Sequence, residues 1–451
     1  MIFVSVAFPA DRRIPITFTG GKLLTMVVLT DMVYFLLVLL TSPIWLWRMI
    51  RTGKIHTDWK ARFGHTKQLK RKSGNQPRLL LHAVSVGEVN TLRTLVPLLK
   101  EDHDLVIAST TDTGFARARA LFGEEFAVVR YPFDFSRMVK RFLDSVSPDA
   151  VGLVELELWP NFLRLCDRRG IPVAVINGRL SERSFRGYRR FRFLLGGFFR
   201  RLAAVAVQDE EYAARFREMG VAADRLRITG SMKWDNAVIE DQVPGAEKLA
   251  RELGLSREVP IVVAGSTAPE ETILIDRAVP DDVQLVIAPR KPEHFDRTAR
   301  ELGGPVRRSR PGEAADRSNR FLLDTIGELR AAYSLADIAI VGRSFGNLFG
   351  SDMTEPISVG AATIIGPAVG DFREMFKAFH EAGGIIQVSA SELAETVSGL
   401  LQDEAKRKAL AEKGRKVIRE KQGASRKHAD ILRELVKEKA KSGRGTNSEM
   451  T

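Results

Sequence analysis

Short apolar runs alternate with longer amphipathic stretches along most of the chain. The runs are rich in β-branched residues, end at turn residues and are separated by stretches of helix length, which predicts parallel strands joined by crossover helices. They lie at 79–86, 105–109, 150–155, 172–177 and 203–208 in a first series, and at 261–264, 284–289, 320–323, 338–341, 362–366 and 384–388 in a second. We therefore expect an α/β fold of two Rossmann-like, doubly wound domains that face each other across a cleft, with ligands at the carboxyl ends of the strands.

The regular alternation breaks near residues 235–247, where a Val-Pro-Gly sequence interrupts it. This break predicts the boundary between the two domains. We expect an irregular extension over 1–22, a membrane-anchor helix over 23–50, a first domain over 51–240, a second domain over 241–425, and a basic helix end and tail over 426–451. The basic stretch at 405–441 is expected to form one helix.

A nearly unbroken apolar segment at 23–47 precedes the first domain. Its length is just sufficient to cross the hydrocarbon core of a bilayer, which takes about 20 residues. Asp31 interrupts the segment near its outer end. The other edge carries an aromatic and then a basic group of residues, namely Trp45, Trp47, Arg48, Arg51 and Lys54. These features predict a single-pass anchor with the N-terminus outside and the rest of the chain in the cytoplasm, and a buried core helix is the alternative.

The composition is that of an ordinary globular protein. Of 451 residues, 44% are hydrophobic and 28% are charged, which excludes wholesale disorder, a collagen-like fold and a polytopic membrane protein. The single cysteine, Cys166, excludes an internal disulfide framework and a cysteine-rich metal site. The 69 Lys and Arg residues exceed the 56 Asp and Glu residues by 13, which indicates phosphate-rich partners such as anionic lipid head groups, nucleotides or nucleic acid.

Positive charge gathers in two segments. Residues 403–451 hold 15 Lys and Arg against 8 Asp and Glu, which is typical of a helix with a solvated basic face. Residues 183–202 hold seven arginines and no acid, with aromatic residues between them. Such a segment suits an interface that is apolar on one side and phosphate-rich on the other, although base stacking and a core helix with a solvated face stay open. The candidate membrane or acceptor surface consists of Arg183, Arg186, Arg189, Arg190 and Arg192.

Acidic residues follow two predicted strands of the first domain. Glu88 stands on the turn after the run at 79–86, where a partly buried carboxylate could act as a general base. A glutamate that merely suits the N-terminus of a helix is the alternative. Glu155 and Glu157 stand at the end of the run at 150–155. Two acids one residue apart can bind a metal, but with no histidine or third acid near them in the sequence we expect no metal site.

Residues suited to a nucleotide follow several runs of the second domain. The segment Gly265-Ser266-Thr267 comes after a strand and is expected to open a helix, where free backbone N–H groups can hold a phosphate. Pro289-Arg290-Lys291 ends the next strand with two cations, which also suit a phosphate. Acids at 350–356 could accept hydrogen bonds from ribose hydroxyls. Capping or turn chemistry could explain each segment alone, but their recurrence favours a nucleotide site.

Seven ordered motifs after residue 23 resemble those of the 3-deoxy-D-manno-octulosonic acid (Kdo) transferases of lipopolysaccharide assembly, glycosyltransferase family 30. The motifs are His82-Ala83-Val84-Ser85-Val86-Gly87-Glu88, Glu155-Leu156-Glu157-Leu158-Trp159-Pro160-Asn161, Asn177-Gly178-Arg179-Leu180-Ser181, Gly230-Ser231-Met232-Lys233-Trp234-Asp235, Gly265-Ser266-Thr267, Pro289-Arg290 and Ile326-Gly327-Glu328-Leu329. The resemblance implies the two-domain GT-B fold, an N-terminal anchor in the inner membrane, CMP-Kdo as donor and a lipid A precursor as acceptor. It also implies an inverting, single-displacement transfer that needs no metal and no bound cofactor.

The resemblance also assigns roles by position. Glu88 matches the catalytic base of the family, and Glu155 and Lys233 match residues that stabilise the transition state. The stretches that bind CMP correspond to Pro289, Arg290, Ile326, Gly327, Glu328, Asp352, Met353, Thr354 and Glu355. The chain departs from the family pattern at three places. Ser351 and Asp352 replace the usual His and Asn, and Lys291 replaces a usual His. The segment after Thr267 is shortened to 268–271.

Two other functions are compatible with the same patterns. A different GT-B transferase would use a nucleotide-diphosphate sugar in place of CMP-Kdo. A membrane-tethered protein that binds a nucleotide or nucleic acid, without catalysis, would also carry the positive net charge. Because the sequence contains no RNA- or DNA-binding motif and Glu88 stands in a complete family motif, we expect a membrane-bound transferase with no nucleic-acid partner.

Overall fold

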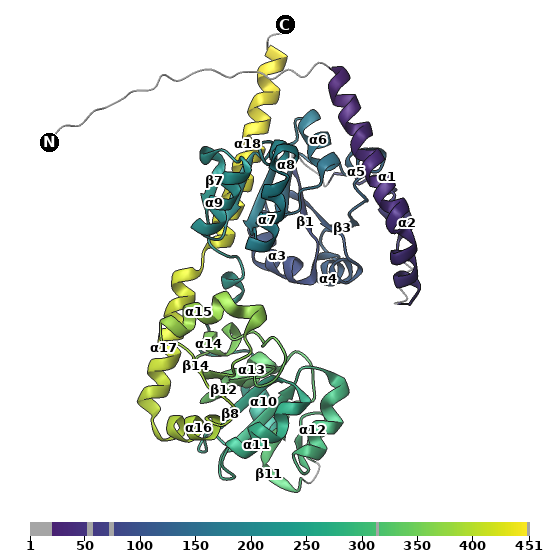
Figure 1. Cartoon of the computed structure of the whole chain (residues 1–451). Coiled ribbons are helices and arrows are strands. Elements are labelled where there is room, and N and C mark those ends of the chain that lie inside the picture. The colour runs from purple at the N-terminus through teal and green to yellow at the C-terminus, as the bar shows by residue number, and fades with distance from the viewer. Residues whose placement is uncertain (1–19, 52–56, 72–75, 313–314, 449–451) are drawn as a thin grey trace, which may run out of the picture. The chain divides into compact units, whose positions relative to one another are not determined.

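The computed structural model describes residues 20–51, 57–71, 76–312 and 315–448 (Figure 1). The chain forms two compact units, which are described one at a time. The first unit comprises the chain up to Thr229 together with the part from Arg426 onward, and the second comprises Gly230–Ser425. Most of the predicted extension over 1–22, and Lys54 of the predicted basic flank, lie outside the described residues.

The first unit is a seven-stranded parallel sheet covered by helices, with the strand order β3-β2-β1-β4-β5-β6-β7. Its strands are β1 (Arg78–Ala83), β2 (Asp104–Ser109), β3 (Ala127–Arg130), β4 (Ala150–Val154), β5 (Val173–Gly178), β6 (Ala204–Val207) and β7 (Leu226–Ile228). Its helices are α1 (Gly20–Arg51), α2 (Trp59–Arg62), α3 (Val86–Leu99), α4 (Asp112–Phe122), α5 (Ser136–Val146), α6 (Pro160–Arg168), α7 (Glu182–Arg190), α8 (Arg192–Phe199), α9 (Glu210–Met219), the 3₁₀ turn η2 (Ala223–Arg225) and α18 (Ala424–Ser448).

The second unit repeats this architecture with the strand order β10-β11-β9-β8-β12-β13-β14. Its strands are β8 (Ile261–Thr267), β9 (Gln284–Pro289), β10 (Pro305–Arg307), β11 (Arg317–Leu322), β12 (Ile338–Val341), β13 (Ala362–Ile365) and β14 (Ile386–Gln387). Its helices are α10 (Ala246–Leu253), α11 (Thr272–Ala278), α12 (Phe295–Glu301), α13 (Leu329–Ser334), α14 (Thr354–Ser358), α15 (Arg373–Glu381), α16 (Leu393–Gln402) and α17 (Glu404–Lys421), with 3₁₀ turns η3 (Trp234–Asn236), η4 (Pro269–Glu271), η5 (Pro292–His294) and η6 (Gly370–Phe372).

The predicted α/β class with parallel strands is confirmed, since each of the twelve strand pairings in the described chain is parallel. Three strands, β3, β7 and β10, were not predicted. Each is at most four residues long and forms an edge of its sheet, so it lacks the long apolar run of a central strand. The run at 79–86 was predicted too long, because β1 ends at Ala83 and Ser85 caps the following helix.

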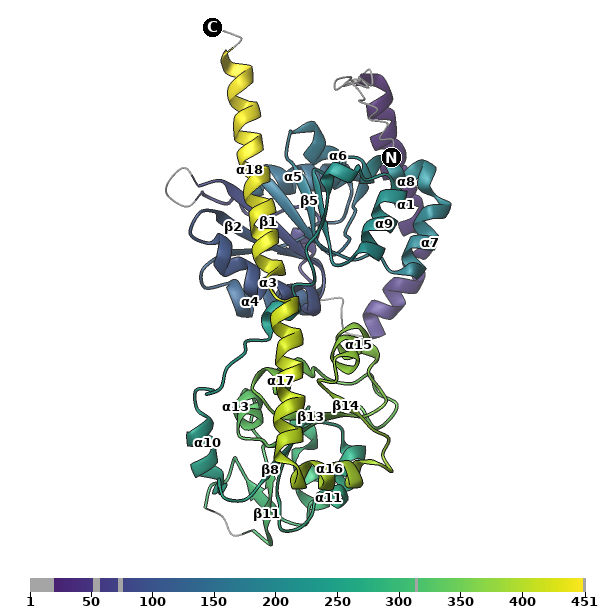
Figure 2. The ribbon, with the colours of Figure 1, turned by 90° about the vertical axis from the view of Figure 1, so that its left-hand side faces the viewer.

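The predicted single helix at 405–441 is wrong, since two helices, α17 and α18, occupy this stretch. The chain turns at Gly423, whose φ of +101° favours glycine. The carboxylate of Asp235 accepts the N–H groups of Gly423 (2.6 Å) and Ser425 (2.5 Å) at the start of α18. Beyond this turn α18 belongs to the first unit and runs across one face of its sheet (Figure 2).

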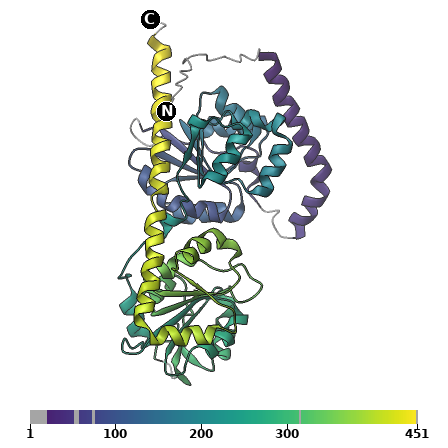
Figure 3. The same ribbon diagram turned by 60° about the vertical axis from the view of Figure 1, so that its left-hand side comes forward.

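Helix α1, the purple helix of Figures 1 and 3, belongs to the first unit and contacts α6. It covers the segment that the sequence predicts as a membrane anchor. Among the helices of the described ranges, none combines the length and the apolarity that crossing a bilayer requires. The anchor therefore stays a prediction.

The strand order of each sheet reverses once, between β1 and β4 in the first unit and between β8 and β12 in the second. At such a reversal the connections leave in opposite directions and open a crevice outside the carboxyl ends of the two strands, where doubly wound proteins bind ligands. The fold therefore directs attention to the residues that directly follow these four strands.

We predict that Gly265→Ala destabilises the fold. A Cβ at this position would lie 2.0 Å from the hydroxyl oxygen of Tyr333, whose ring is buried beneath the end of β8. Because a fully buried ring cannot move aside, the free energy of unfolding should fall by about 1–3 kcal/mol in denaturant titrations. The matched control is Gly399→Ala on the exposed side of α16, where no atom lies within 4 Å of the new Cβ. That change should raise stability by about 0.5–1 kcal/mol, and equal effects of the two would contradict the steric explanation.

Candidate active site

Three glutamates gather where the strand order of the first unit reverses. Glu88 lies in the first turn of α3, after β1, and Glu155 and Glu157 directly follow β4. The charge of Glu155 influences the titration of Glu88, and the charge of Glu88 influences that of Glu157, so the three carboxyl groups form one electrostatic cluster. The structure thus brings together two residues to which the sequence assigns catalytic roles, and adds Glu157 to them.

The carboxylate of Glu88 is held by the backbone of the turn before its own helix. It accepts the N–H of Val84 at 2.8 Å and the hydroxyl of Ser85 at 2.9 Å, and the Ser85 hydroxyl accepts the Glu88 N–H at 3.3 Å. This is a capping box, the structural role that the sequence left open as the alternative. Burial nevertheless raises the pKa of Glu88, the hydrogen bonds from Val84 and Ser85 oppose this, and the charge of Glu155 adds to the rise. A buried carboxylate with a raised pKa also suits a general base.

Glu155 and Glu157 are held differently from Glu88. Glu155 adopts a left-handed backbone, with φ of +61°, and its N–H donates to the carbonyl of Ile176. Non-glycine residues rarely adopt this conformation, and where they do the surrounding structure compensates, often at a functional site. Within the described chain the Glu155 carboxylate has no hydrogen bond or ion pair. Burial, followed by the charges of Glu88 and Glu155, raises the pKa of Glu157 to about 7, so this group holds a proton during part of the time at neutral pH.

Two buried histidines support the strand ends of the first unit. His82 on β1 contacts Thr110 at 2.9 Å and stacks on Tyr131, and burial lowers its pKa to about 3. The Nε2 atom of His428 on α18 accepts the N–H of Asn177 at 3.3 Å, and Asn177 is left-handed with φ of +51°. Sequence analysis missed His428, because its partner lies 251 residues away and the tail shows only a basic helix.

Lys233 belongs to the second unit, in a segment whose other side chains are fixed. Trp234 is buried against Phe379 with ring centroids 5.2 Å apart, and Asp235 caps α18. Lys233 itself is half-buried, and no ion pair involves it among the described residues. An ammonium group that is positioned by its neighbours yet unpaired can bind an anion.

The carboxylate of Glu271 organises the reversal point of the second unit. It accepts the N–H groups of Ala268, Arg343, Ser344 and Phe345 at 2.7–3.0 Å and is buried. It thereby ties the loop after β8 to the loop after β12. Sequence analysis did not single out Glu271, because three of its partners lie more than 70 residues away.

The segment Gly265-Ser266-Thr267 does not open a helix as predicted, since these are the last three residues of β8. Ser266 is left-handed, with φ of +56°, and a register shift between Gly265 and Thr267 lets Thr267 pair with Pro289 on β9. Because the strand continues through the bulge, the helix begins only after η4. Arg343, after β12, is also left-handed, with φ of +58°.

The residues predicted to bind CMP lie in loops of the second unit. Arg290 follows β9 with an exposed side chain, and its N–H donates to the carbonyl of Thr267 at 3.0 Å. Ile326 is 71% exposed, and Gly327 has φ of +95°. Burial alone would raise the pKa of Glu328, but hydrogen bonds from Arg308 and Thr325 lower it, so this carboxylate already has partners within the unit.

The remaining CMP-binding candidates surround the start of α14. The Oδ1 atom of Asp352 accepts the N–H of Thr354 at 2.9 Å and its hydroxyl at 2.6 Å, so Asp352 acts as a local cap. Met353 is buried, and Glu355, the second residue of α14, is half-buried. Both Asp352 and Glu355 influence the buried Tyr333, whose pKa burial raises well above its usual value. These carboxylates therefore lie near the end of β8, which contacts Tyr333.

Arginines of α7 and α8 form an exposed basic surface with apolar residues between them. Arg183, Arg186, Arg189, Arg190 and Arg192 are all exposed. Arg186 pairs with Glu182 at 2.9 Å and Arg189 approaches Glu218 at 3.8 Å. Phe191, Phe193 and Leu194 are exposed beside them, Phe193 to 81%.

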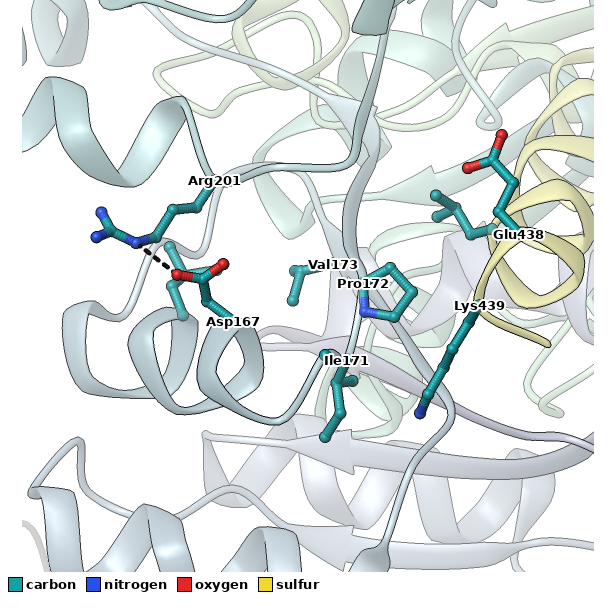
Figure 4. A pocket seen from close by; sticks show the side chains of 10 residues that line it. Asp167, Ile171, Pro172, Val173, Arg201, Glu438 and Lys439 are labelled. Carbon is teal, nitrogen blue, oxygen red and sulfur yellow. Dashed lines mark hydrogen bonds and ion pairs between the residues drawn. The ribbon is translucent and has the colours of Figure 1, made fainter. Parts of the chain in front are cut away.

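Two pockets of the described chain lie at different ends of the strands. One, of about 260 Å³, lies where the first unit's β5 begins, between α6 and α18 (Figure 4). Asp167 and Arg201 form an ion pair of 3.1 Å at its edge. Because the strands are parallel, the start of β5 and the carboxyl end of β4, where the glutamates lie, are at opposite ends of the sheet. The other, of about 390 Å³, lies in the second unit and is lined by Glu271, Leu274 and residues 345–348. The second pocket is therefore the one adjacent to a reversal point.

No group of three or more His, Cys, Asp or Glu residues in the described part of the chain is arranged to hold a metal ion. The first unit presents clustered carboxylates, and the second presents cations, carboxylates and a pocket. This combination suits proton transfer from a hydroxyl and binding of a nucleotide.

Comparison with known proteins identifies the family. The family model described as 3-deoxy-D-manno-octulosonic-acid transferase (kdotransferase) matches residues 57–236. A 3-deoxy-D-manno-octulosonic acid transferase of Bordetella pertussis is 31% identical over 430 residues, which cover 88% of this chain and 97% of the relative. The chain belongs to the Kdo transferase family. This Kdo transferase is also 29% identical to a protein of the same name from Haemophilus influenzae over 368 residues, covering 79% and 86% of the two chains.

The solved structures agree with the predicted two-domain glycosyltransferase fold. A crystal structure of a glycosyltransferase from Rickettsia africae matches with a TM-score of 0.55 and 14% identity, covering 81% of the Kdo transferase chain and 100% of that structure. At this identity the likeness concerns the fold, and it confirms the GT-B type. The Kdo transferase is therefore a glycosyltransferase with a parallel sheet in each unit.

We predict that Glu271→Ala strongly destabilises the Kdo transferase. The change leaves four backbone N–H groups without their acceptor, so the free energy of unfolding should fall by about 2–5 kcal/mol in denaturant titrations. Glu270→Ala is the matched control, because Glu270 is the neighbouring glutamate and is exposed. The control should change stability by less than about 0.5 kcal/mol. Equal losses in the two variants would show that the hydrogen bonds to Glu271 do not stabilise the loops.

Proposed function

We propose that the enzyme transfers Kdo from CMP-Kdo to a lipid A precursor in lipopolysaccharide assembly, with Glu88 as the general base. The observation that carries this proposal is the glutamate cluster at the reversal point of a doubly wound sheet in a Kdo transferase. Burial raises the pKa of the Glu88 carboxylate, and a higher pKa makes its ionised form a better proton acceptor.

In the proposed reaction an acceptor sugar hydroxyl attacks the anomeric carbon of Kdo. The Glu88 carboxylate takes the proton of that hydroxyl, the new glycosidic bond forms, and the bond from the anomeric carbon to the CMP phosphate breaks. CMP leaves with the electron pair of the broken bond, and the anomeric configuration inverts. The free carboxylate of Glu155 would stabilise positive charge that develops on the sugar ring in the transition state.

Donor binding is assigned to the second unit. Arg290 is exposed, Lys233 is unpaired in the described chain, and both carry charge suited to the departing phosphate. Glu355 would accept hydrogen bonds from ribose hydroxyls. Asp352 already accepts two hydrogen bonds from Thr354, which directs it to a capping role and explains how a carboxylate is tolerated where the family has Asn.

The acceptor is a membrane lipid in this proposal, so the enzyme must reach an anionic surface at the cytoplasmic side of the inner membrane. The arginines of α7 and α8, with the exposed Phe193 and Leu194, suit such a surface. The N-terminal helix would add the attachment that the sequence predicts. The direct test is turnover of purified enzyme with CMP-Kdo and a lipid A precursor, with products identified by mass. Turnover with a nucleotide-diphosphate sugar in place of CMP-Kdo would favour the other transferase class.

We predict that Glu88→Gln abolishes transfer but leaves the fold intact. The amide oxygen can still accept a backbone hydrogen bond, whereas the amide cannot take a proton, so kcat should fall by about 10²–10⁴-fold. Ser85→Ala is the matched control, because it removes the hydroxyl that bonds Glu88 but leaves the carboxylate. This control should lose about 1 kcal/mol of stability and keep most of its turnover. A Glu88→Gln enzyme that keeps more than about a tenth of wild-type kcat would exclude Glu88 as the base.

We predict that Glu155→Gln shifts the pH dependence of transfer. A base must be ionised, so activity should fall as the pH drops through the raised pKa of Glu88. The charge of Glu155 contributes to that raised pKa, so removing it removes a repulsion and lowers the pKa of Glu88. The acidic limb of kcat against pH should therefore move to lower pH. Glu124→Gln, an exposed glutamate of the same unit, is the control and should leave the limb in place. An unmoved limb in Glu155→Gln would separate the cluster from catalysis.

A further inference from the structure

The N-terminal helix α1 is bound to the first unit through polar side chains on one face. Asp31 accepts the N–H of Ser136 at 3.0 Å and the side-chain amide of Asn161 at 2.8 Å. The Tyr34 hydroxyl donates to Asp134 at 3.0 Å. Thr30 accepts a hydrogen bond of 2.6 Å from Arg164 of α6. We call Thr30, Asp31 and Tyr34 the polar seam of α1.

The polar seam supports two helix ends of the first unit that lack caps of their own, directly at α5 and at α6 through Asp134, to which Tyr34 donates. Helix α5 has no side-chain cap at Phe135, and Asp31 supplies an acceptor for its first N–H, that of Ser136. Helix α6 likewise has no side-chain cap of its own, and Asp134 accepts the N–H groups of Asn161 and Phe162 at 2.9 Å. Because buried helix ends need such acceptors, the seam belongs to the fold of the unit.

The chain that follows α1 returns to the same loop of the first unit. Arg62 accepts the N–H of Phe133 through its carbonyl at 2.9 Å, and the rings of Trp59 and Phe133 lie 6.5 Å apart. Phe133 directly precedes the residues that hold the seam. The six residues from Arg51 to Thr57 can span at most about 20 Å. Thus both ends of the helical stretch after Tyr34 are tied to one unit, whereas crossing a bilayer would put them on opposite sides of about 30 Å of hydrocarbon.

The face of α1 opposite to the seam is apolar and exposed. It presents Phe35, Leu36, Leu39, Leu40, Ile44 and Trp47, of which Leu40 is 74% exposed. The guanidinium of Arg51 lies over the Trp47 ring at 5.2 Å. We call these six residues the apolar stripe. An apolar stripe that ends in a cation stacked on an aromatic ring is typical of a helix lying in the interface of a membrane.

Helix α6 contacts both α1 and α8, the second of which carries part of the basic surface. Arg164 of α6 donates to Thr30 on one side and lies over the ring of Phe198 on the other, at 5.0 Å. The helices that carry the stripe and the arginines are therefore joined through α6 within the first unit. Exposed apolar side chains and five exposed arginines on one unit match the chemistry of an anionic leaflet, with acyl chains beneath phosphate head groups.

We propose that α1 does not span the membrane but lies flat in one anionic leaflet, clamped to the first unit by its polar seam. The occupant of the apolar stripe is lipid, and this identity rests on the proposed membrane-borne acceptor, whereas the clamp rests on the contacts alone. In this arrangement the membrane contact and the glutamate cluster belong to the same compact unit.

The first test is a disulfide trap in the full chain, with the native Cys166 replaced by Ala. The pair Asp31→Cys and Ser136→Cys joins residues in direct contact, so oxidation should cross-link it in vesicles of phosphatidylethanolamine and phosphatidylglycerol. The control pair Leu36→Cys and Ser136→Cys places one thiol on the exposed face and should cross-link at least about tenfold less. Cross-linked peptides are identified by mass. Formation of the first disulfide in detergent but not in vesicles would overturn the clamp.

The first test replaces Asp31, which accepts the first N–H of α5. The second test keeps Asp31, so the start of α5 stays capped. Single spin labels at Leu36, Leu40 and Ile44 should all report the same depth in those vesicles, about 5–10 Å below the head groups. A spanning helix would instead change depth by about 12 Å over these eight residues. Labels that remain in water would overturn lipid as the occupant. The depths are measured without CMP-Kdo and without a lipid A precursor. A failure of the proposed transfer reaction would therefore leave this result unaffected.

Discussion

Backbone N–H groups at the ends of strands and helices need acceptors, and in both units buried or half-buried carboxylates provide them. Glu88 serves the turn after β1, Glu271 the loops after β8 and β12, and Asp235 the start of α18. Asp31 and Asp134 do the same for α5 and α6. An N–H group buried without a partner destabilises a fold by about 1–3 kcal/mol, so each carboxylate fixes the path of the loop it serves.

This use of carboxylates gives Glu88 two roles. A residue that only capped α3 would be best left fully ionised and free of neighbouring acids, because a cap benefits from negative charge at a helix N-terminus. Glu88 instead shares its surroundings with Glu155 and Glu157, whose charges oppose its own. This repulsion disfavours the ionised form of Glu88, which the helix cap prefers, and raises the proton affinity that a general base needs. The backbone hydrogen bonds hold the carboxylate in place while its proton affinity rises.

The sequence predicted the central strands, the α/β class and the strand ends that carry the glutamates, because each depends on neighbours within a few residues. The capping box at Ser85 and Glu88 is itself a local signature, which is why both roles of Glu88 could be foreseen. Glu271, His428 and the seam at Asp31 could not, since their partners lie 72 to 251 residues away. The bulge at Ser266 escaped for a different reason, because a left-handed serine leaves no mark in the hydrophobic pattern.

The return of α18 to the first unit bears on how the chain folds as it is made. Residues up to Thr229 leave the ribosome first, yet His428, which holds Asn177 at the end of β5, is synthesised about 200 residues later. At about 5–20 residues per second this delay lasts roughly 10–40 s. The second unit is continuous in the chain and can complete its core before the first one does. During that interval the first unit exposes the sheet face that α18 later covers, so the part of the enzyme made first is the part most in need of protection from aggregation.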